Sequence, residues 1–474
     1  MLATLCFHLA QTGVSPLTTG EVDAAAPLLR GETRLDIFHG YLGVFIVAFV
    51  VTLLSTPIMR RLAIQNGIID RPSEARKIHR VPVAYLGGVA VFIGMLAAIV
   101  FSFVAPDLVI SGKVISLIDE HRSQFEQKPV PVSVLVGMFA IMFTGLMDDV
   151  THLVPRAKIG GQLLAAAALA YEDVGTKVAA GLLQPIGALL GNQDLQYTFS
   201  LPVSLPLFGS VIHLDLIYWT GVAIIAMFVL GACNASNLID GLDGLLSGVT
   251  AICAIGLLMI ALGMAVADDG QLDSGRVTLC MALLGACLGF LPHNFNPATI
   301  FLGDAGSLLL GYVTIVIVLM LGDTGRTHLV VAGLLIYSIP IIDTVLAMVR
   351  RKLAGKPFSA PDDQHLHHML KRALGVKGAV LALYGIGTVF AALGVWLSMG
   401  RVRVVFTIAM VFAAFIGVTA VKVARRQALE AQAAALGGAL AGAAPPPPPP
   451  PPPAQHGPHG SGAPRPARES AVAP

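Results

Sequence analysis

The chain has 474 residues, of which 55% are hydrophobic and only 12% are charged, and its formal net charge is +2. Soluble domains carry about 25% charged residues, so this composition excludes an ordinary soluble globular protein. Runs of about 20 apolar residues recur along the sequence, and each is long enough to cross a bilayer as a helix. The five cysteines form no CxxC pair, which argues against a disulfide framework or a zinc site. The composition predicts an all-α polytopic membrane protein.

The apolar runs predict about eleven transmembrane helices. In chain order they cover residues 40–58, 84–105, 130–147, 160–190, 215–233, 244–265, 277–292, 305–322, 328–349, 379–397 and 403–422. The fourth run contains Glu172, Asp173 and Lys177, so we expect only part of it to cross the membrane. The segment 192–214 alternates in polarity and carries prolines, which indicates a small β-hairpin outside the membrane plane.

Lysine and arginine gather in the loops that follow the odd-numbered spans. The positive-inside rule therefore predicts an N-terminus outside the cell and a cytoplasmic C-terminus. Three regions follow: an extracytoplasmic N-terminal segment (1–39), a transmembrane domain (40–422) and a tail (423–474). The tail contains nine consecutive prolines. Such a tract favours polyproline II and cannot build a core, so we expect a disordered cytoplasmic tail.

Five polar clusters interrupt the apolar pattern, and the predicted topology puts all five on the cytoplasmic side. They are RKIHRVPVAYLGG (76–88), GLMDDV (145–150), NASNLIDGLDG (234–244), PHNFNPATIFLGDAGS (292–307) and SAPDDQHLHHML (359–370). Asp-Gly pairs also form turns and cap helices, so each cluster alone has an ordinary structural explanation. Their coincidence on one membrane face predicts a single active site there.

The clusters contain five aspartates that would repel one another unless a cation neutralised them: Asp148, Asp149, Asp240, Asp243 and Asp304. Hard oxygen ligands suit Mg²⁺, which proteins commonly hold with one or two carboxylates and the phosphates of a substrate. Asp240 and Asp243 are three residues apart, so a helical turn would place both on one face. We therefore expect a Mg²⁺ site, with Mn²⁺ as the alternative ion.

The last cluster contributes His365, His367 and His368, with His365 and His368 expected on one helix face. Histidines here are candidates for phosphate contact or proton transfer, and the alternative is an interfacial loop with solvated histidines. Two lysines, Lys77 and Lys158, stand beside polar clusters and are candidates for phosphate contacts. The positive-inside rule alone also explains basic residues at this face.

Asp343 lies inside an apolar run. We expect it to make an interior helix–helix hydrogen bond and to have no part in function.

The clusters, taken in order, resemble the polyprenyl-phosphate N-acetylhexosamine-1-phosphate transferases, the WecA/MraY family. The resemblance is carried by DD, NxxNxxDGLDGL, NxxPAxxFxGDxGS and HLHH, and it covers about residues 40–422. It implies transfer of a phospho-sugar from a UDP-N-acetylhexosamine to a polyprenyl phosphate, usually undecaprenyl phosphate, with Mg²⁺ and release of UMP. It also implies a multi-pass protein of the bacterial plasma (inner) membrane, with a cytoplasmic site beside a lipid-facing groove.

The resemblance assigns roles motif by motif. Asp148 and Asp149 match an aspartate pair proposed as nucleophile, base or lipid-phosphate contact, and Asp304 matches the Mg²⁺ ligand, with Asp148 a second candidate ligand. The histidine motif is matched by His365, His367 and His368. The matched substrate-binding positions are Lys77 (nucleotide), Lys158 and Asn294 (diphosphate), Asn237 and Asp240 (nucleotide cleft), Gly241, Leu242 and Asp243 (uracil), and Phe301 (stacking on uracil).

The stretch GKPFSAPDDQHLHH resembles the N-acetylglucosamine branch, which starts O-antigen, teichoic acid or arabinogalactan linkers. The muramoyl-pentapeptide branch of peptidoglycan synthesis usually carries three adjacent histidines and is the alternative. One departure is Asp363, which stands where the N-acetylglucosamine branch usually has Arg or Lys. A non-catalytic scaffold also remains open, as does a transporter, because intramembrane acids often mark ion pathways. Expected partners are the two substrates and membrane lipid; a homodimer rests on the family alone, and no nucleic acid is expected.

Overall fold

The computed structural model describes most of the predicted membrane domain. The described residues are 33–70, 82–105, 109–110, 113–114, 129–189, 191, 198–201, 212–353, 355 and 365–412, with isolated positions between 414 and 429. The described residues from Thr33 to Lys422 belong to one compact unit. Lys77, Asp363 and the proline tract, which the sequence singled out, lie outside the described residues.

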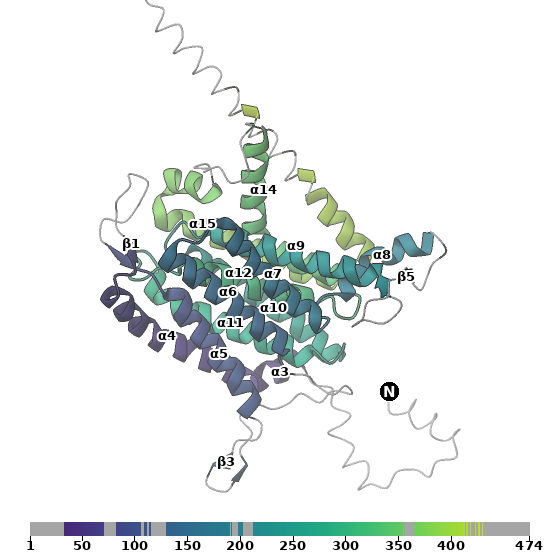
Figure 1. Cartoon of the computed structure of the whole chain (residues 1–474), viewed down its shortest axis with the longest axis horizontal. Helices are drawn as coiled ribbons and strands as arrows, with labels where there is room; N and C mark the ends of the chain where they lie inside the picture. Colours follow the sequence, from purple (N-terminus) through teal and green to yellow (C-terminus); the bar gives the residue numbers. More distant parts are fainter. Residues whose placement is uncertain are drawn as a thin grey trace, which may run out of the picture. The chain divides into compact units, whose positions relative to one another are not determined.

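Eight helices of the described part are long and apolar enough to cross a membrane. They are α4 (Leu42–Gln65), α5 (Gly87–Val104), α6 (Val132–Thr151), α9 (Leu216–Ile239), α10 (Leu245–Ala267), α11 (Asp273–Asn294), α12 (Gly303–Met320) and α15 (Leu366–Ser398). A ninth span is formed if α13 (Thr327–Ile336) and α14 (Ser338–Leu353), which meet at a bend of 78°, count as one. The prediction of a multi-pass all-α membrane protein is confirmed (Figure 1).

The predicted number of eleven spans is not reached among the described residues, for two reasons. The fourth run forms two shorter helices, α7 (Pro155–Tyr171) and α8 (Lys177–Leu189), of 17 and 13 residues. Between them Asp173 and Gly175 have positive φ angles of 58° and 91°, which ends the first helix. The last run, 403–422, is described only as a short apolar helix, Val402–Phe412, and isolated positions beyond it. The orientation of the chain across the membrane stays a prediction.

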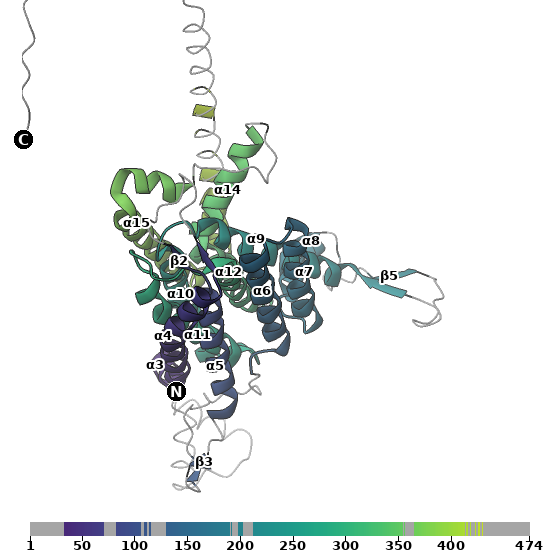
Figure 2. The same ribbon diagram turned by 60° about the vertical axis from the view of Figure 1, so that its left-hand side comes forward.

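The remaining elements are short. They are the helix α3 (Arg34–Gly40) and the strands β1 (Ile69–Asp70), β2 (Val83–Ala84), β3 (Val109–Ile110), β4 (Lys113–Val114), β5 (Thr198–Leu201) and β6 (Ile212–Asp215). The strands form three antiparallel pairs in chain order, β1 with β2, β3 with β4 and β5 with β6. The last pair is the predicted hairpin, with Thr198 opposite Asp215, and it extends away from the helices in Figure 2.

The helix α12 occupies the centre of the helical unit. It packs against α5, α6, α9, α10 and α11, and every residue from Ala305 to Met320 is buried. A helix that is apolar all round belongs in such an interior position. Polar residues of α12 are concentrated in its first turns, so the place where α12 begins is also where Asp304 meets the neighbouring helices.

Two glycines allow α5 and α6 to approach the first turn of α12. A Cβ atom on Gly145 of α6 would lie 2.5 Å from the Cα atom of Ala305, and one on Gly88 of α5 would collide with the backbone of Gly306. Backbones come this close only where a residue has no side chain. The first turn of α12, which carries Asp304, can therefore lie this close to α5 and α6 only because Gly88 and Gly145 have no side chains.

The link between α11 and α12 is joined by hydrogen bonds to the segment that leads into α5. The backbone N–H of Phe301 donates to the carbonyl of Ala84 at 2.9 Å. Gly87 donates back to the carbonyl of Phe301 at 3.0 Å, and Gly88 to that of Leu302 at 2.8 Å. These bonds fix the backbone of Phe301 beside the segment that leads into α5.

Candidate active site

A lysine and two aspartates form the centre of the site. The Lys158 ammonium lies 2.7 Å from Oδ2 of Asp148 and 2.6 Å from Oδ2 of Asp304. The helix α6 ends in a tight turn at His152, whose φ is 53°, and α7 begins at Pro155, so Lys158 folds back beside Asp148. All three side chains keep some solvent exposure, between 14% and 28%, so a solute can reach this centre.

The second aspartate of the pair has a different environment. Oδ1 of Asp149 accepts the backbone N–H of Asp304 at 2.7 Å, and its Oδ2 accepts that of Ala305 at 3.1 Å. These are unpaired donors of the first turn of α12, where a negative charge is also favoured by the helix dipole. Asp149 thus caps α12 from a neighbouring helix, while Asp148 faces the lysine.

Asn237, near the end of α9, completes the surroundings of Asp304. Its amide nitrogen donates to Oδ1 of Asp304 at 2.8 Å and to the hydroxyl of Ser307 at 3.0 Å. Both oxygens of Asp304 therefore have donors, Lys158 on one and Asn237 on the other.

The segment between α9 and α10 is a tight turn. Residues 240–244 are not helical, and Gly244 has a φ of 78°. The expectation that a helical turn places Asp240 and Asp243 on one face is therefore wrong, because the glycines break the helix there. Instead, Oδ2 of Asp243 accepts the amide of Asn296 at 2.9 Å and the backbone N–H of Ala298 at 3.0 Å.

Asn294 supports the same turn from inside. Its Oδ1 accepts the backbone N–H of Gly244 at 3.2 Å and the hydroxyl of Ser247 at 3.0 Å, and its amide donates to the carbonyl of Ile300 at 3.1 Å. The side chain is buried. Asn294 thus connects the 240–244 turn to the loop that carries Phe301, and within that turn Leu242 is buried while Gly241 is exposed.

Phe301 has an aromatic neighbour that the sequence did not single out. The ring centroids of Tyr85 and Phe301 lie 6.1 Å apart. Burial raises the pKa of Tyr85, and the charges of Asp70, Asp149 and Asp304 raise it too, so this phenol faces the acidic centre. Tyr85 lies within the first polar cluster, but an isolated tyrosine gives no signal in a sequence.

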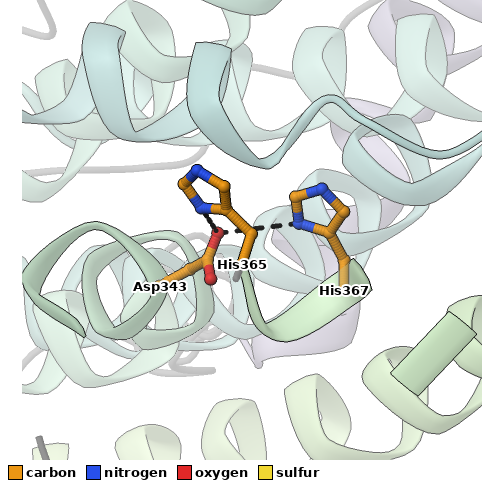
Figure 3. A group of neighbouring side chains, drawn as sticks. All are labelled: Asp343, His365 and His367. Carbon is orange, nitrogen blue, oxygen red and sulfur yellow. Dashed lines mark hydrogen bonds and ion pairs between the residues drawn. The ribbon is translucent and has the colours of Figure 1, made fainter. Parts of the chain in front are cut away.

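The histidine motif lies beside the 240–244 turn and is held by Asp343. Nδ1 of His365 is 2.9 Å from Oδ2 of Asp343, and Nδ1 of His367 is 3.6 Å from the same oxygen (Figure 3). His365 is the N-cap of α15, which begins at Leu366, and its ring centroid lies 6.2 Å from that of His368, so the two histidines are neighbours on the first turn as expected. The imidazole of His367 faces Gly241, where it would collide with any added side chain.

Comparison with known proteins identifies the family. Residues 131–322 match glycosyl transferase family 4. A probable undecaprenyl-phosphate N-acetylglucosaminyl 1-phosphate transferase from Bacillus subtilis (strain 168) is 32% identical over 367 residues, which cover 75% of this chain and 86% of that protein. The chain belongs to glycosyl transferase family 4. The resemblance seen in the sequence is confirmed.

Two further relatives are also named as transferases that act with a polyprenyl phosphate and N-acetylglucosamine phosphate. A decaprenyl-phosphate N-acetylglucosaminephosphotransferase from Mycolicibacterium smegmatis is 32% identical over 408 residues, covering 80% of this chain and 88% of that protein. An undecaprenyl-phosphate alpha-N-acetylglucosaminyl 1-phosphate transferase from Escherichia coli (strain K12) is 29% identical over 333 residues, covering 69% and 75%.

The donor atoms of the family 4 site fit a divalent cation. Oxygens of Asp148 and Asp304 converge on one ammonium group, so this position already holds a positive charge between two carboxylates. Carboxylate oxygens are the hard ligands that Mg²⁺ prefers. Asp304 and Asp148 are the residues that would hold it, with Lys158 and Asn237 beside them.

The environment of Asp240 predicts that the stability of this family 4 protein depends on pH. Burial, followed by the charges of Asp304, Asp149 and Asp243, raises the pKa of Asp240 to about 8 from the usual 3.8. Between these values the folded protein holds a proton that the unfolded chain has released, so stability is present at low pH and falls as the pH rises towards 8. The slope is at most about 1.4 kcal/mol for each pH unit.

We expect Asp240→Asn to flatten this slope. The measurement is the unfolding temperature of detergent-purified protein in EDTA at several pH values from 5 to 8. The control is Asp215→Asn, which removes a carboxylate at the other end of α9. A slope in Asp240→Asn as steep as that of the wild type would contradict this environment for Asp240.

Proposed function

We propose that the chain transfers N-acetylglucosamine 1-phosphate from UDP-N-acetylglucosamine to a polyprenyl phosphate, such as undecaprenyl phosphate, and releases UMP. The observation that carries the proposal is the match to relatives named for this transfer, at 32% identity over most of both chains. A lysine between two carboxylates, at the ends of helices long enough to span a membrane, suits a reaction between two anionic substrates.

The reaction needs one exchange of bonds. An oxygen of the lipid phosphate forms a bond to the β-phosphorus of the UDP-sugar, and the bond from that phosphorus to the bridging oxygen breaks. UMP leaves with that oxygen and its electron pair. Because a phosphate monoester is largely ionised at neutral pH, no strong base is required. Phosphoryl transfer depends mainly on positioning and charge neutralisation, so we favour direct attack over an aspartyl-phosphate intermediate.

The polar side chains divide these tasks. In the proposal Lys158 donates to phosphate oxygens of the substrates, and Asp148 and Asp304 orient the ammonium. Bound Mg²⁺, with Asp304 and Asp148 as ligands, would supply neutralisation of the diphosphate charge. Both oxygens of Asp149 accept backbone N–H groups, which supports a role in holding α12 rather than in attack on phosphorus.

In the proposal the nucleotide binds at the 240–244 turn. Gly241, Leu242 and Asp243 would contact uracil, on which Phe301 would stack, and Asn237 and Asp240 would line the cleft. Asn294 would act by holding the turn, given its hydrogen bonds to Gly244 and Ser247. Lys77 is assigned to the nucleotide by resemblance alone, and His365, His367 and His368 to the phosphates or a proton transfer.

The cellular location and the oligomeric state are also part of the proposal. We propose that the protein lies in a bacterial plasma membrane, has its active site on the cytoplasmic face and forms a homodimer. The loops rich in lysine and arginine support the orientation. The names of the relatives support the N-acetylglucosamine branch over the peptidoglycan branch.

The test is an assay with purified protein, undecaprenyl phosphate, Mg²⁺ and UDP-N-acetylglucosamine that follows UMP and the lipid product. We expect UMP release that requires the lipid and stops with EDTA. Activity only with UDP-N-acetylmuramoyl-pentapeptide would move the protein to the peptidoglycan branch. No turnover with any UDP-sugar would favour a scaffold, and substrate uptake by proteoliposomes without UMP release would favour a transporter.

A further inference from the structure

Asp343 connects the bent helix pair to the histidine motif, and the reaction described above gives it no role. Its Oδ2 accepts from Nδ1 of His365 at 2.9 Å, and its Oδ1 accepts the backbone N–H of Leu366 at 2.7 Å. The side chain is only 1% exposed. A buried carboxylate is costly unless it is hydrogen-bonded, so this pair of donors is what permits an aspartate here.

The two bonds fix both the backbone and one ring of the motif. Leu366 is the first residue of α15, so Asp343 occupies the positive end of that helix. A carboxylate that accepts from Nδ1 places a proton on that nitrogen, which sets the tautomer and the plane of the His365 ring. The ring of His365 stacks on that of His367 at a centroid distance of 5.4 Å, and His367 lies 4.3 Å from His368. Orientation imposed on His365 is therefore passed to its neighbours.

The far side of this group contacts the 240–244 turn. The ring of His367 packs against Gly241, and Tyr384, also on α15, donates a hydrogen bond to the carbonyl of Gly244. The helix α15 therefore touches both ends of the turn assigned to the nucleotide. Asp343 holds the beginning of α15 where this contact is made.

We propose that Asp343 is a positioning residue, which acts through His365 and His367 to set the histidine motif and the 240–244 turn for the UDP-sugar. This inference rests on the proposed function. Asp343, His365 and His367 also offer three ligand atoms within 4.8 Å of one another, the arrangement of a metal site. The hydrogen bonds to His365 and Leu366 already satisfy both oxygens of Asp343, which favours the positioning role over a metal.

The experiment is a double-mutant cycle with Asp343→Asn and His365→Gln, measuring kcat and KM for UDP-N-acetylglucosamine. If Asp343 acts through His365, each single variant should lower kcat/KM by about 10- to 100-fold. The kcat/KM of the double variant should then lie within about threefold of that of the less active single variant. Asp343→Glu, which keeps the charge, should retain more activity than Asp343→Asn. Losses that multiply in the double variant would overturn the proposal, because independent structural damage is additive in free energy.

Two readouts separate this proposal from the proposed function. The same cycle is measured for UDP-N-acetylglucosamine binding by calorimetry, which needs no turnover. An inactive wild type would contradict the proposed function, and the binding cycle would still decide the role of Asp343 by the same criterion. One equivalent of a transition metal in the purified protein, lost in Asp343→Asn, would overturn the positioning role and assign a metal site.

Discussion

Asp304→Asn is expected to lower turnover by about 10³-fold while the protein remains folded. The substitution keeps the size of the side chain but removes the charge that pairs with Lys158 and that, in the proposed function, would hold Mg²⁺. Loss of one electrostatic contact to the developing charge of a reaction commonly costs about 10² to 10³ in kcat, and the proposed contact with Mg²⁺ would be lost too. The measurement is the rate of UMP release at saturating Mg²⁺.

The matched control for this variant is Asp323→Asn. Asp323 follows the other end of α12, where it pairs with Lys177 at 3.3 Å, so the same chemical change is made away from the site. We expect Asp323→Asn to keep at least half of the activity. Wild-type turnover in Asp304→Asn would remove Asp304 from the centre of the site.

Gly145→Ala is expected to reduce activity by about 10²-fold although it removes no polar side chain. The new methyl group would lie 2.5 Å from the backbone N and Cα of Ala305, which cannot move without shifting the first turn of α12. Overpacking of this kind costs about 1–3 kcal/mol of stability, and a displacement of 1 Å in a catalytic group can cost about 10² in rate. The measurements are UMP release and the unfolding temperature.

Gly231→Ala is the control for the glycine variant. Gly231 is also in a membrane-spanning helix, α9, but nothing lies within 4 Å of the position of its added Cβ atom. Alanine favours a helix over glycine by about 1 kcal/mol, so this control should be active and at least as stable as the wild type. Equal activity in the two alanine variants would show that the contact between α6 and α12 does not set the site.

The helical membrane fold could be predicted because apolar runs reveal spans directly. The number of spans could not, since a run such as 160–190 has the total length of a span even though Asp173 and Gly175 divide it. The bend of 78° between α13 and α14 was equally hidden, because both halves are apolar. Hydropathy reports composition along the chain and carries no information about where the backbone turns.

The site residues that lie within sequence motifs could be predicted from those motifs. Asp148, Lys158 and Asp304 come together as expected, although they are spread over more than 150 residues of the sequence. The distinction between Asp148 and Asp149 was not predictable, because adjacent carboxylates look alike until their partners are known. The helix–helix hydrogen bond expected of Asp343 is confirmed, but its partner 22 residues away in the histidine motif could not be read from one sequence.

The most direct measurement follows a label in the β-phosphate of UDP-N-acetylglucosamine. Purified protein is incubated with ³²P-labelled donor, undecaprenyl phosphate and Mg²⁺, and the lipid and nucleotide fractions are separated. The account predicts label in the lipid product and unlabelled UMP in the nucleotide fraction, since the β-phosphate travels with the sugar. Label retained in released UDP, with the sugar alone on the lipid, would contradict it.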